Sequence, residues 1–157
     1  MPVKTGGTAF LIFLFLVTSL HPSTVFLAAE GGEVLVGCNE DFDFPISKIS
    51  FVPGKNGQYG AVYFGFEIGW QQAGLNERGL FFKWNATPPV ILNLSDAKEP
   101  YEGNLVEVIL QQCASVEEAL GLLEQYHDPV FEKAQLFLGD ASGASAVVEG
   151  DAVRKKE

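Results

Sequence analysis

The sequence predicts one α+β domain built from layered antiparallel strands and helices. Short runs of β-branched and aromatic residues, separated by turn residues, fill most of the chain from residue 23 to residue 85. Two amphipathic stretches with helical spacing follow between residues 103 and 125. Strand-like runs then return. This order of strands, then two helices, then strands again favours an α+β fold over an α/β fold, in which strands and helices alternate.

The first part of the chain carries four strand-like runs. They are Ser23–Ala29, Val34–Cys38, Ile49–Pro53 and Ala61–Phe66. Turn residues join the members of each pair, with two glycines in the first turn and Gly-Lys-Asn-Gly in the second. Between the pairs lies an acidic loop, in which Phe42 and Phe44 would anchor the chain and leave Asp41 or Asp43 partly desolvated. A solvated turn is the alternative.

The stretch from Gly69 to Asn85 predicts a hairpin of strands Gln71–Leu75 and Leu80–Trp84. In its turn, Gly79 supplies a positive φ and Asn76 can bond the backbone two residues on. The second strand is apolar apart from Lys83. It delivers Asn85 to a strand end, where a side-chain amide can stabilise a developing negative charge. An ordinary surface hairpin is the alternative.

After a Pro-Pro break, the helical pair and a last hairpin complete the domain. The stretch Gly103–Cys113 has apolar residues at helical spacing. A capping box at Ser115–Glu118 opens a second helix, Val116–Gln125. The final strands are expected at Ala134–Leu138 and Ala144–Val148. The charged end from Arg154 onward predicts no element.

Composition excludes several classes of function. A formal net charge of -10 and a pI near 4.6 argue against partners such as nucleic acid and anionic membrane surfaces. The two cysteines, Cys38 and Cys113, allow one disulfide at most, and their apolar surroundings favour buried thiols. No cluster of His and Cys has metal-ligand spacing, and no glycine motif binds phosphate, so we expect no metal and no cofactor.

The N-terminus predicts an export signal. Lys4 precedes the apolar run Ala9–Leu20, which is too short for a comfortable membrane span. We therefore expect residues 1–22 to form a signal peptide or N-terminal hydrophobic segment and residues 23–157 to form the domain. An uncleaved anchor is the alternative, and Ala29 is a competing cleavage position. The expected location is secreted or periplasmic.

Four motifs in order resemble the linear amide C–N hydrolases, which include choloylglycine hydrolases and penicillin V acylases, within the N-terminal-nucleophile (Ntn) superfamily. The motifs are Ser23–Phe26, Gly37–Phe42, Gly74–Leu80 and Asp140–Glu149. Each is weak alone, and together they cover roughly residues 23 to 150. The resemblance implies an αββα sandwich of two stacked antiparallel sheets with flanking helices. The resemblance also implies that the sandwich is incomplete in this chain, because the family's later catalytic Asn and Arg would lie beyond Glu157.

The resemblance implies hydrolysis of a small-molecule amide by the residue at the mature N-terminus. Its side chain attacks the carbonyl, and its own α-amino group is the base. Ser23 falls on the nucleophile position, where the family usually has Cys. Asp41 matches the aspartate that holds the amine, and Asn85 matches the first oxyanion-hole residue. Cys38 falls where many members carry Arg, so the usual cation is missing.

Four alternatives stay open. Ser23 is also an ordinary strand-start residue, and Asp41 is also a turn-capping acid. The chain could be a truncated, non-catalytic family member with a binding or structural role. It could also be an unrelated secreted binding module that uses an aromatic face of Phe64, Phe66, Trp70 and Trp84. Substrate identity and oligomeric state do not follow from the sequence.

Overall fold

The computed structural model describes residues 23–41, 46–66, 69–92 and 98–156. The predicted N-terminal segment, residues 1–22, lies outside the described residues, as do Phe42, Asp43 and Phe44.

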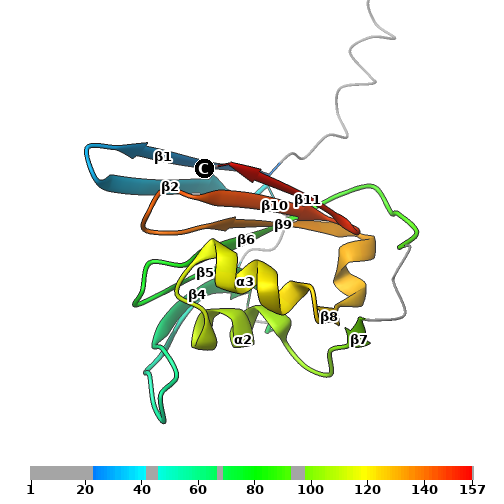
Figure 1. The fold of residues 1–157 in the computed structure, drawn as a ribbon, viewed down its shortest axis with the longest axis horizontal. Helices are drawn as coiled ribbons and strands as arrows, with labels where there is room; N and C mark the ends of the chain where they lie inside the picture. Colours follow the sequence, from blue (N-terminus) through cyan, green and yellow to red (C-terminus); the bar gives the residue numbers. More distant parts are fainter. Residues whose placement is uncertain (1–22, 42–45, 67–68, 93–97, 157) are drawn as a thin grey trace, which may run out of the picture.

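A seven-stranded antiparallel sheet forms the centre of the molecule, with the order β11-β10-β9-β6-β5-β4-β3 (Figure 1). Its strands are β3 (Ser47–Val52), β4 (Ala61–Phe66), β5 (Gln71–Asn76), β6 (Phe81–Ala86), β9 (Ala134–Gly139), β10 (Ser145–Glu149) and β11 (Ala152–Lys156). The predicted hairpin β5–β6 brings β6 to the middle of this sheet, where β9 pairs with it along its whole length.

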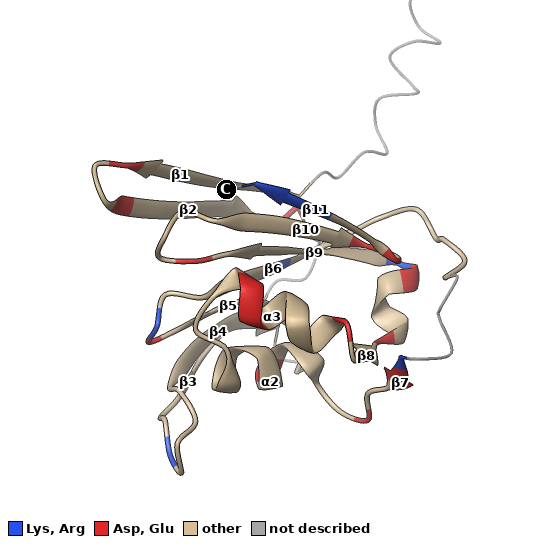
Figure 2. Cartoon of the chain, viewed as in Figure 1, with Lys and Arg blue, Asp and Glu red and all other residues tan. Residues whose placement is uncertain are grey.

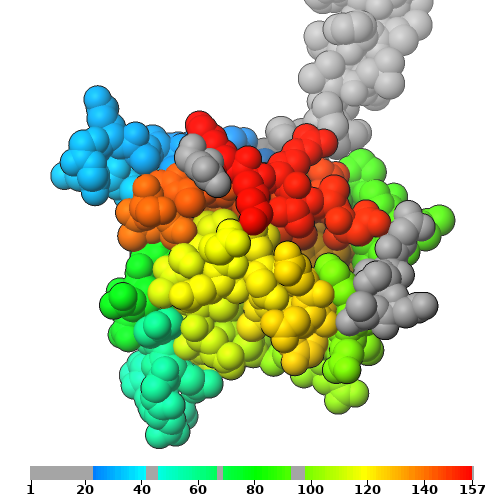
Figure 3. Space-filling view, viewed as in Figure 1, coloured from blue at the N-terminus to red at the C-terminus, as the bar shows by residue number. Residues whose placement is uncertain are grey.

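A separate two-stranded sheet, β1 (Thr24–Glu30) with β2 (Glu33–Asn39), forms a second layer over one face of the large sheet (Figure 1). The two layers are in contact at Gly139, where an added Cβ would lie 2.6 Å from a methyl group of Leu27. The tip of this hairpin projects from one end of the molecule (Figure 3), and a Cβ added at Gly31 or Gly32 would meet no atom within 4 Å.

The helices α2 (Leu105–Gln112) and α3 (Val116–Leu123) cover the other face of the large sheet (Figure 1). The short strand β7 (Glu99–Pro100) precedes α2 and pairs in parallel with β8 (Tyr126–His127), which follows α3. The 3-10 helix η1 (Pro129–Glu132) then leads into β9. The core lies between helices and sheet, and the sheet contributes alternate residues to it, as a half-buried sheet must. Its fully buried members include Leu80, Phe82, Ile109, Leu110, Leu136 and Leu138.

The side chains of Asn76 and Asp140 connect the turns of the sheet to the helices through hydrogen bonds. In the β5–β6 turn, Asn76 Oδ1 accepts hydrogen bonds from the amides of Arg78 (3.0 Å) and Leu80 (2.9 Å), while its Nδ2 donates to the carbonyls of Leu110 and Cys113, both at 2.8 Å. Those carbonyls lie at the end of α2, where the helix leaves acceptors unpaired. The predicted turn is confirmed, with Gly79 at φ 86°.

Asp140 makes the corresponding connection in the β9–β10 turn. One carboxylate oxygen accepts from the amide of Val116, the first residue of α3, at 2.9 Å, and the other accepts from Ser142. Burial works to raise the pKa of Asp140, but the hydrogen bonds from Ser142, Val116 and Ala144 outweigh it and hold the pKa below its usual value. Ser115 also caps α3, as predicted, with its hydroxyl accepting from the Glu118 amide.

The predicted α+β architecture of antiparallel sheets and helices is confirmed. The eight expected strands and two expected helices are present, with ends that differ by at most two residues. The expectation that no element forms from Arg154 onward is wrong, because Ala152–Lys156 pairs with β10 as β11. In the part of the chain that the structure describes, no helix covers the outer face of β1–β2, so three of the four layers of an αββα sandwich are seen.

The hairpin does not cover the whole of its face of the large sheet. Cross-strand partners share a face, and the pairings Ile49↔Phe64, Phe51↔Val62, Val62↔Leu75 and Leu75↔Phe81 place these side chains on the side of the hairpin. Four of them are solvent-exposed and form what we call the exposed patch: Ile49, Phe51, Phe64 and Leu75.

Candidate active site

The central strand β6 supplies two polar side chains to the face that the hairpin covers. Its residues alternate, so Leu80, Phe82 and Trp84 enter the helix-side core. Lys83 and Asn85 therefore point to the opposite side. Both are buried, Lys83 completely and Asn85 with 7% of its surface exposed. Polar groups buried at this depth require partners, which makes this part of the sheet a candidate site.

The ammonium group of Lys83 forms an ion pair with Glu40, the residue that follows β2, and donates a hydrogen bond to the carbonyl of Trp84. Lys is almost never fully buried unless it is paired. The Glu40 side chain keeps 31% of its surface exposed, so the pair is buried on the lysine side and open on the other.

Ser23 lies beside the same carboxylate. Its hydroxyl donates to Glu40 Oε2 at 3.3 Å, whereas Lys83 contacts Oε1. The backbone holds Ser23 in this place, because β1 begins with Thr24 paired to Asn39, and the Thr24 amide donates to Asn39 Oδ1 at 2.9 Å. Ser23 is thus connected to the central strand through one glutamate.

Asn85 lies two residues beyond Lys83 on the same face of β6. Its Oδ1 is buried and has no hydrogen-bond partner among the described residues. Buried side-chain oxygens of this kind are uncommon in folded proteins. The Asn85 side chain is therefore placed to bind a molecule or residue outside the described part of the chain.

Asp41, the third predicted site residue, is exposed and follows Glu40 directly. In the described ranges it makes no hydrogen bond or ion pair, and the contact to the Ser23 hydroxyl comes from Glu40 instead. The structure therefore brings Ser23 to the Lys83–Asn85 side of β6 through Glu40, and leaves Asp41 at the edge of the group.

Glu40 and Lys83 are site residues that sequence reasoning missed. The signal for Lys83 was present, since it is the one charge in an otherwise apolar strand. A lone charge in a central strand predicts a buried partner. The partner could not be chosen from sequence, because Glu40, Asp41 and Asp43 lie within four residues of one another.

The cysteines differ from each other. The structure has both as free thiols, with Cys113 buried, as predicted, and Cys38 exposed, which corrects the expectation for that residue. Burial raises the pKa of Cys113 to about 11. Partial burial also raises the pKa of Cys38, while the charge of Lys83 lowers it and that of Glu40 raises it further. Both charges of the Lys83–Glu40 ion pair therefore act on the Cys38 thiol. Position 38 is where the resemblance implies an Arg, which this chain lacks.

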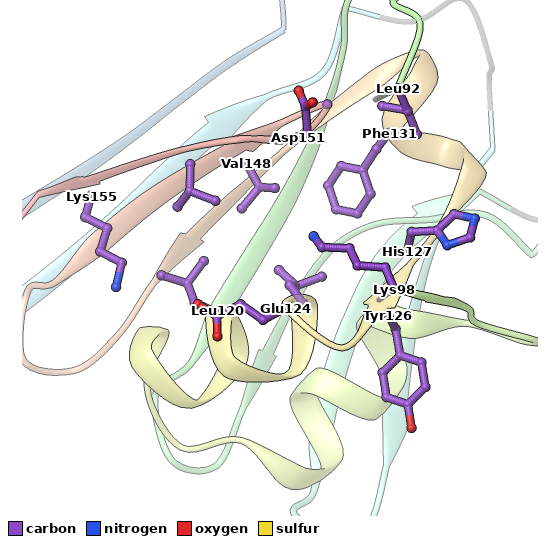
Figure 4. A pocket seen from close by; sticks show the side chains of 13 residues that line it. Leu92, Lys98, Leu120, Glu124, Tyr126, His127, Phe131, Val148, Asp151 and Lys155 are labelled. Carbon is purple, nitrogen blue, oxygen red and sulfur yellow. The ribbon is translucent and has the colours of Figure 1, made fainter. Parts of the chain in front are cut away.

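A hollow of about 300 Å³ lies on the opposite, helix-side face of the sheet (Figure 4). Its wall is largely apolar, with Leu120, Phe131 and Val148, and its rim carries charges of both signs, including Lys98 and Glu124. One rim charge, Lys155 of β11, already pairs with Glu117 at the start of α3. Figure 2 shows the basic residues of β11 and the acidic residues at the start of α3. Val148 is on the helix side and Lys83 is not, so this hollow is separate from the candidate site.

Within the described residues, no group of three or more His, Cys, Asp or Glu could hold a metal ion. None of the helices in those ranges has the length and apolar character needed to span a membrane.

Comparison with known proteins finds similarity of structure alone. No family profile matches the sequence, and no curated protein matches it. Several solved structures match the fold, among them a hydrolase and an acylase. A variant of conjugated bile acid hydrolase from Clostridium perfringens has a TM-score of 0.60 at 22% identity, over 86% of this chain and 51% of that one. Penicillin V acylase from Agrobacterium tumefaciens has a TM-score of 0.56 at 19% identity, over 86% and 49%.

Both structures are Ntn-type linear amide C–N hydrolases. This chain spans about half the length of each. The resemblance predicted from the four sequence motifs is therefore confirmed, and the chain has the fold of the linear amide C–N hydrolases of the Ntn superfamily over the length that it covers.

Proposed function

We propose that this chain is an exported amidase or acylase that hydrolyses a linear amide C–N bond with Ser23 as nucleophile. The observation that carries the proposal is the position of Ser23. Its hydroxyl lies at the start of β1 and contacts a carboxylate that is itself paired to the central strand β6. The fold, shared with two amide hydrolases, adds support.

In the proposed reaction, export and removal of residues 1–22 free the α-amino group of Ser23. An α-amine titrates near pH 8, so a useful fraction is neutral and can accept the hydroxyl proton. The Ser23 oxygen then bonds to the amide carbon, and the amine passes the proton to the departing nitrogen. Water releases the acyl group in a second step. Asp41 would hold the amine, and Asn85 Nδ2 would donate to the oxyanion.

The similar proteins suggest what to test as substrates. One is a conjugated bile acid hydrolase and the other a penicillin V acylase. We propose a small-molecule amide with an apolar acyl group, and a panel of conjugated bile acids, penicillin V and N-acyl amino acids covers that range. The expected result is slow hydrolysis of at least one member by protein whose N-terminus is Ser23.

Two measurements test the proposal together. N-terminal sequencing of the exported protein shows whether Ser23 becomes the first residue, and cleavage at Ala29 would remove the nucleophile. Hydrolysis by the processed protein should then disappear in Ser23→Ala and persist in Ser142→Ala, an exposed serine in the β9–β10 turn. A Ser23→Ala rate equal to wild type would falsify the assignment and favour a non-catalytic binding role.

A further inference from the structure

We propose that Glu40 and Lys83 are positioning residues of this site, with Lys83 fixing the carboxylate of Glu40 and Glu40 orienting the hydroxyl of Ser23. The inference rests on the proposed function for its role in catalysis. The arrangement of Ser23, Glu40 and Lys83 rests on their contacts alone, so one of the two experiments below needs no substrate.

The first step is the burial of Lys83. Its side chain is fully buried in the middle of the seven-stranded sheet, and an ammonium group there is stable only with a counterion and hydrogen-bond acceptors. Within the described residues the counterion is Glu40 and the acceptor is the Trp84 carbonyl. The ion pair therefore ties the carboxylate of Glu40 to the central strand of the sheet.

The second step is that the two oxygens of the Glu40 carboxylate bind different partners. Lys83 binds Oε1, which leaves Oε2 for the Ser23 hydroxyl. A serine hydroxyl otherwise rotates freely among its staggered positions, and a fixed acceptor restricts it to one. The distance of 3.3 Å is long for such a bond, and catalytic hydrogen bonds often tighten only when substrate is present.

The third step is the charge that Lys83 brings. Family resemblance places a cation at position 38, where this chain has Cys38. The Lys83 charge acts on the Cys38 thiol, so a positive charge reaches this region from the neighbouring layer of the fold. In this chain the cation of the site is supplied by Lys83 of the central strand rather than by position 38 of β2.

The first experiment measures the surroundings of residue 23 without substrate. Ser23→Cys in the full chain replaces the hydroxyl with a thiol, and alkylation by iodoacetamide at a series of pH values, read by mass spectrometry of that peptide, gives its pKa. Nearby carboxylates raise a thiol pKa and cations lower it. Adding Glu40→Gln should lower the midpoint by about 1 pH unit, and adding Lys83→Met should raise it.

Controls separate positioning from general damage. Glu117→Gln removes one partner of the exposed pair with Lys155 and should leave the midpoint unchanged. Asp41→Asn should shift it less than Glu40→Gln does. A variant that unfolds would move the midpoint toward the ordinary thiol value near 8.5 whichever charge is removed. Shifts of opposite sign for Glu40→Gln and Lys83→Met cannot arise from unfolding. Equal midpoints in all variants, or a larger shift from Asp41→Asn, would overturn the inference.

The second experiment measures hydrolysis by the processed protein. Glu40→Gln should lower kcat by about tenfold with KM little changed, because orientation of the nucleophile affects the chemical step. Lys83→Arg, which keeps the cation, should retain more activity than Lys83→Met. If the wild type hydrolyses the panel and Glu40→Gln matches it, the positioning role is wrong and the proposed function stands. If no variant hydrolyses the panel but the thiol pKa shifts in opposite directions in Glu40→Gln and Lys83→Met, the proposed function fails and the positioning geometry stands.

Discussion

The two faces of the seven-stranded sheet are built on different principles. The helix-side face is closed by α2, α3 and η1 and is almost entirely apolar, with Leu136 and Leu138 fully buried. The hairpin-side face combines a buried ion pair, a buried amide with an unpaired oxygen and an exposed patch of large apolar side chains. The main apolar cluster therefore lies on the first face, and the residues of the candidate site lie on the second.

The largest expected effect tests the closed face. Leu136→Ala should lower the free energy of unfolding by about 2–5 kcal/mol, because it leaves a cavity beneath the helices. Ile49→Ala, in the exposed patch of the other face, should change it by less than about 0.5 kcal/mol. Chemical denaturation of both variants measures the difference. Equal losses would show that the two faces are packed alike.

A second prediction concerns the ion pair and its asymmetry. Glu40→Gln leaves Lys83 buried without a counterion, and should cost about 2–3 kcal/mol of unfolding free energy. Lys83→Met should cost less, because Glu40 is partly exposed and can be hydrated when its partner is removed. Thermal unfolding of the two variants at equal ionic strength checks the order. A greater loss for Lys83→Met would mean that Glu40 is the more deeply buried partner.

The third prediction concerns the connection between sheet and helices at Asp140. Asp140→Asn should cost about 1–2 kcal/mol, since the charged acceptor of the Val116 and Ser142 amides is lost. The folded-state pKa of Asp140 is lowered, so its contribution is fully present above the ordinary carboxyl pKa and is lost as the pH falls through the lower folded-state value. Unfolding curves from pH 7 down to acid should converge for wild type and Asp140→Asn. A constant gap at all pH values would contradict the assignment.

The smallest effect on stability is expected in the exposed patch. Phe51 is 80% exposed, so Phe51→Ser should change the unfolding free energy by less than about 0.5 kcal/mol. It should nevertheless reduce concentration-dependent association, because a contiguous apolar patch favours self-contact. Light scattering over a concentration series measures this. Val153→Ser, at an exposed valine on the helix-side face of β11, is the matched control and should leave association unchanged.

Local sequence patterns accounted for most of the fold. Alternation and turn chemistry located β4, β5 and β6, because Asn76 and Gly79 leave the chain few other conformations. Strand β11 was missed because Arg154, Lys155 and Lys156 have low strand propensity. At this edge of the sheet they pair with β10 and remain exposed to solvent.

The candidate site was predictable in part. Motif order gave Ser23, Asp41 and Asn85, which are separated by many residues in the sequence. The contact between Glu40 and Lys83 joins two layers of the fold, and no local pattern encodes which acid meets a buried lysine. Such pairings depend on the packing of the hairpin onto the sheet, which periodicity does not describe.

The hydrogen bonds of Asn76 have a consequence for motion. One side chain ties the β5–β6 turn to the last carbonyls of α2, and a second, Asp140, ties the neighbouring turn to the first amide of α3. The corner between the helices is therefore held at both sides by the same end of the sheet. Sliding of the helical layer over the sheet would break these bonds together, so helices and sheet should open as one cooperative unit. In hydrogen exchange, the amides of Leu80 and Val116 should then be protected to a similar degree, although they lie in a turn and at a helix start, where exchange is usually fast.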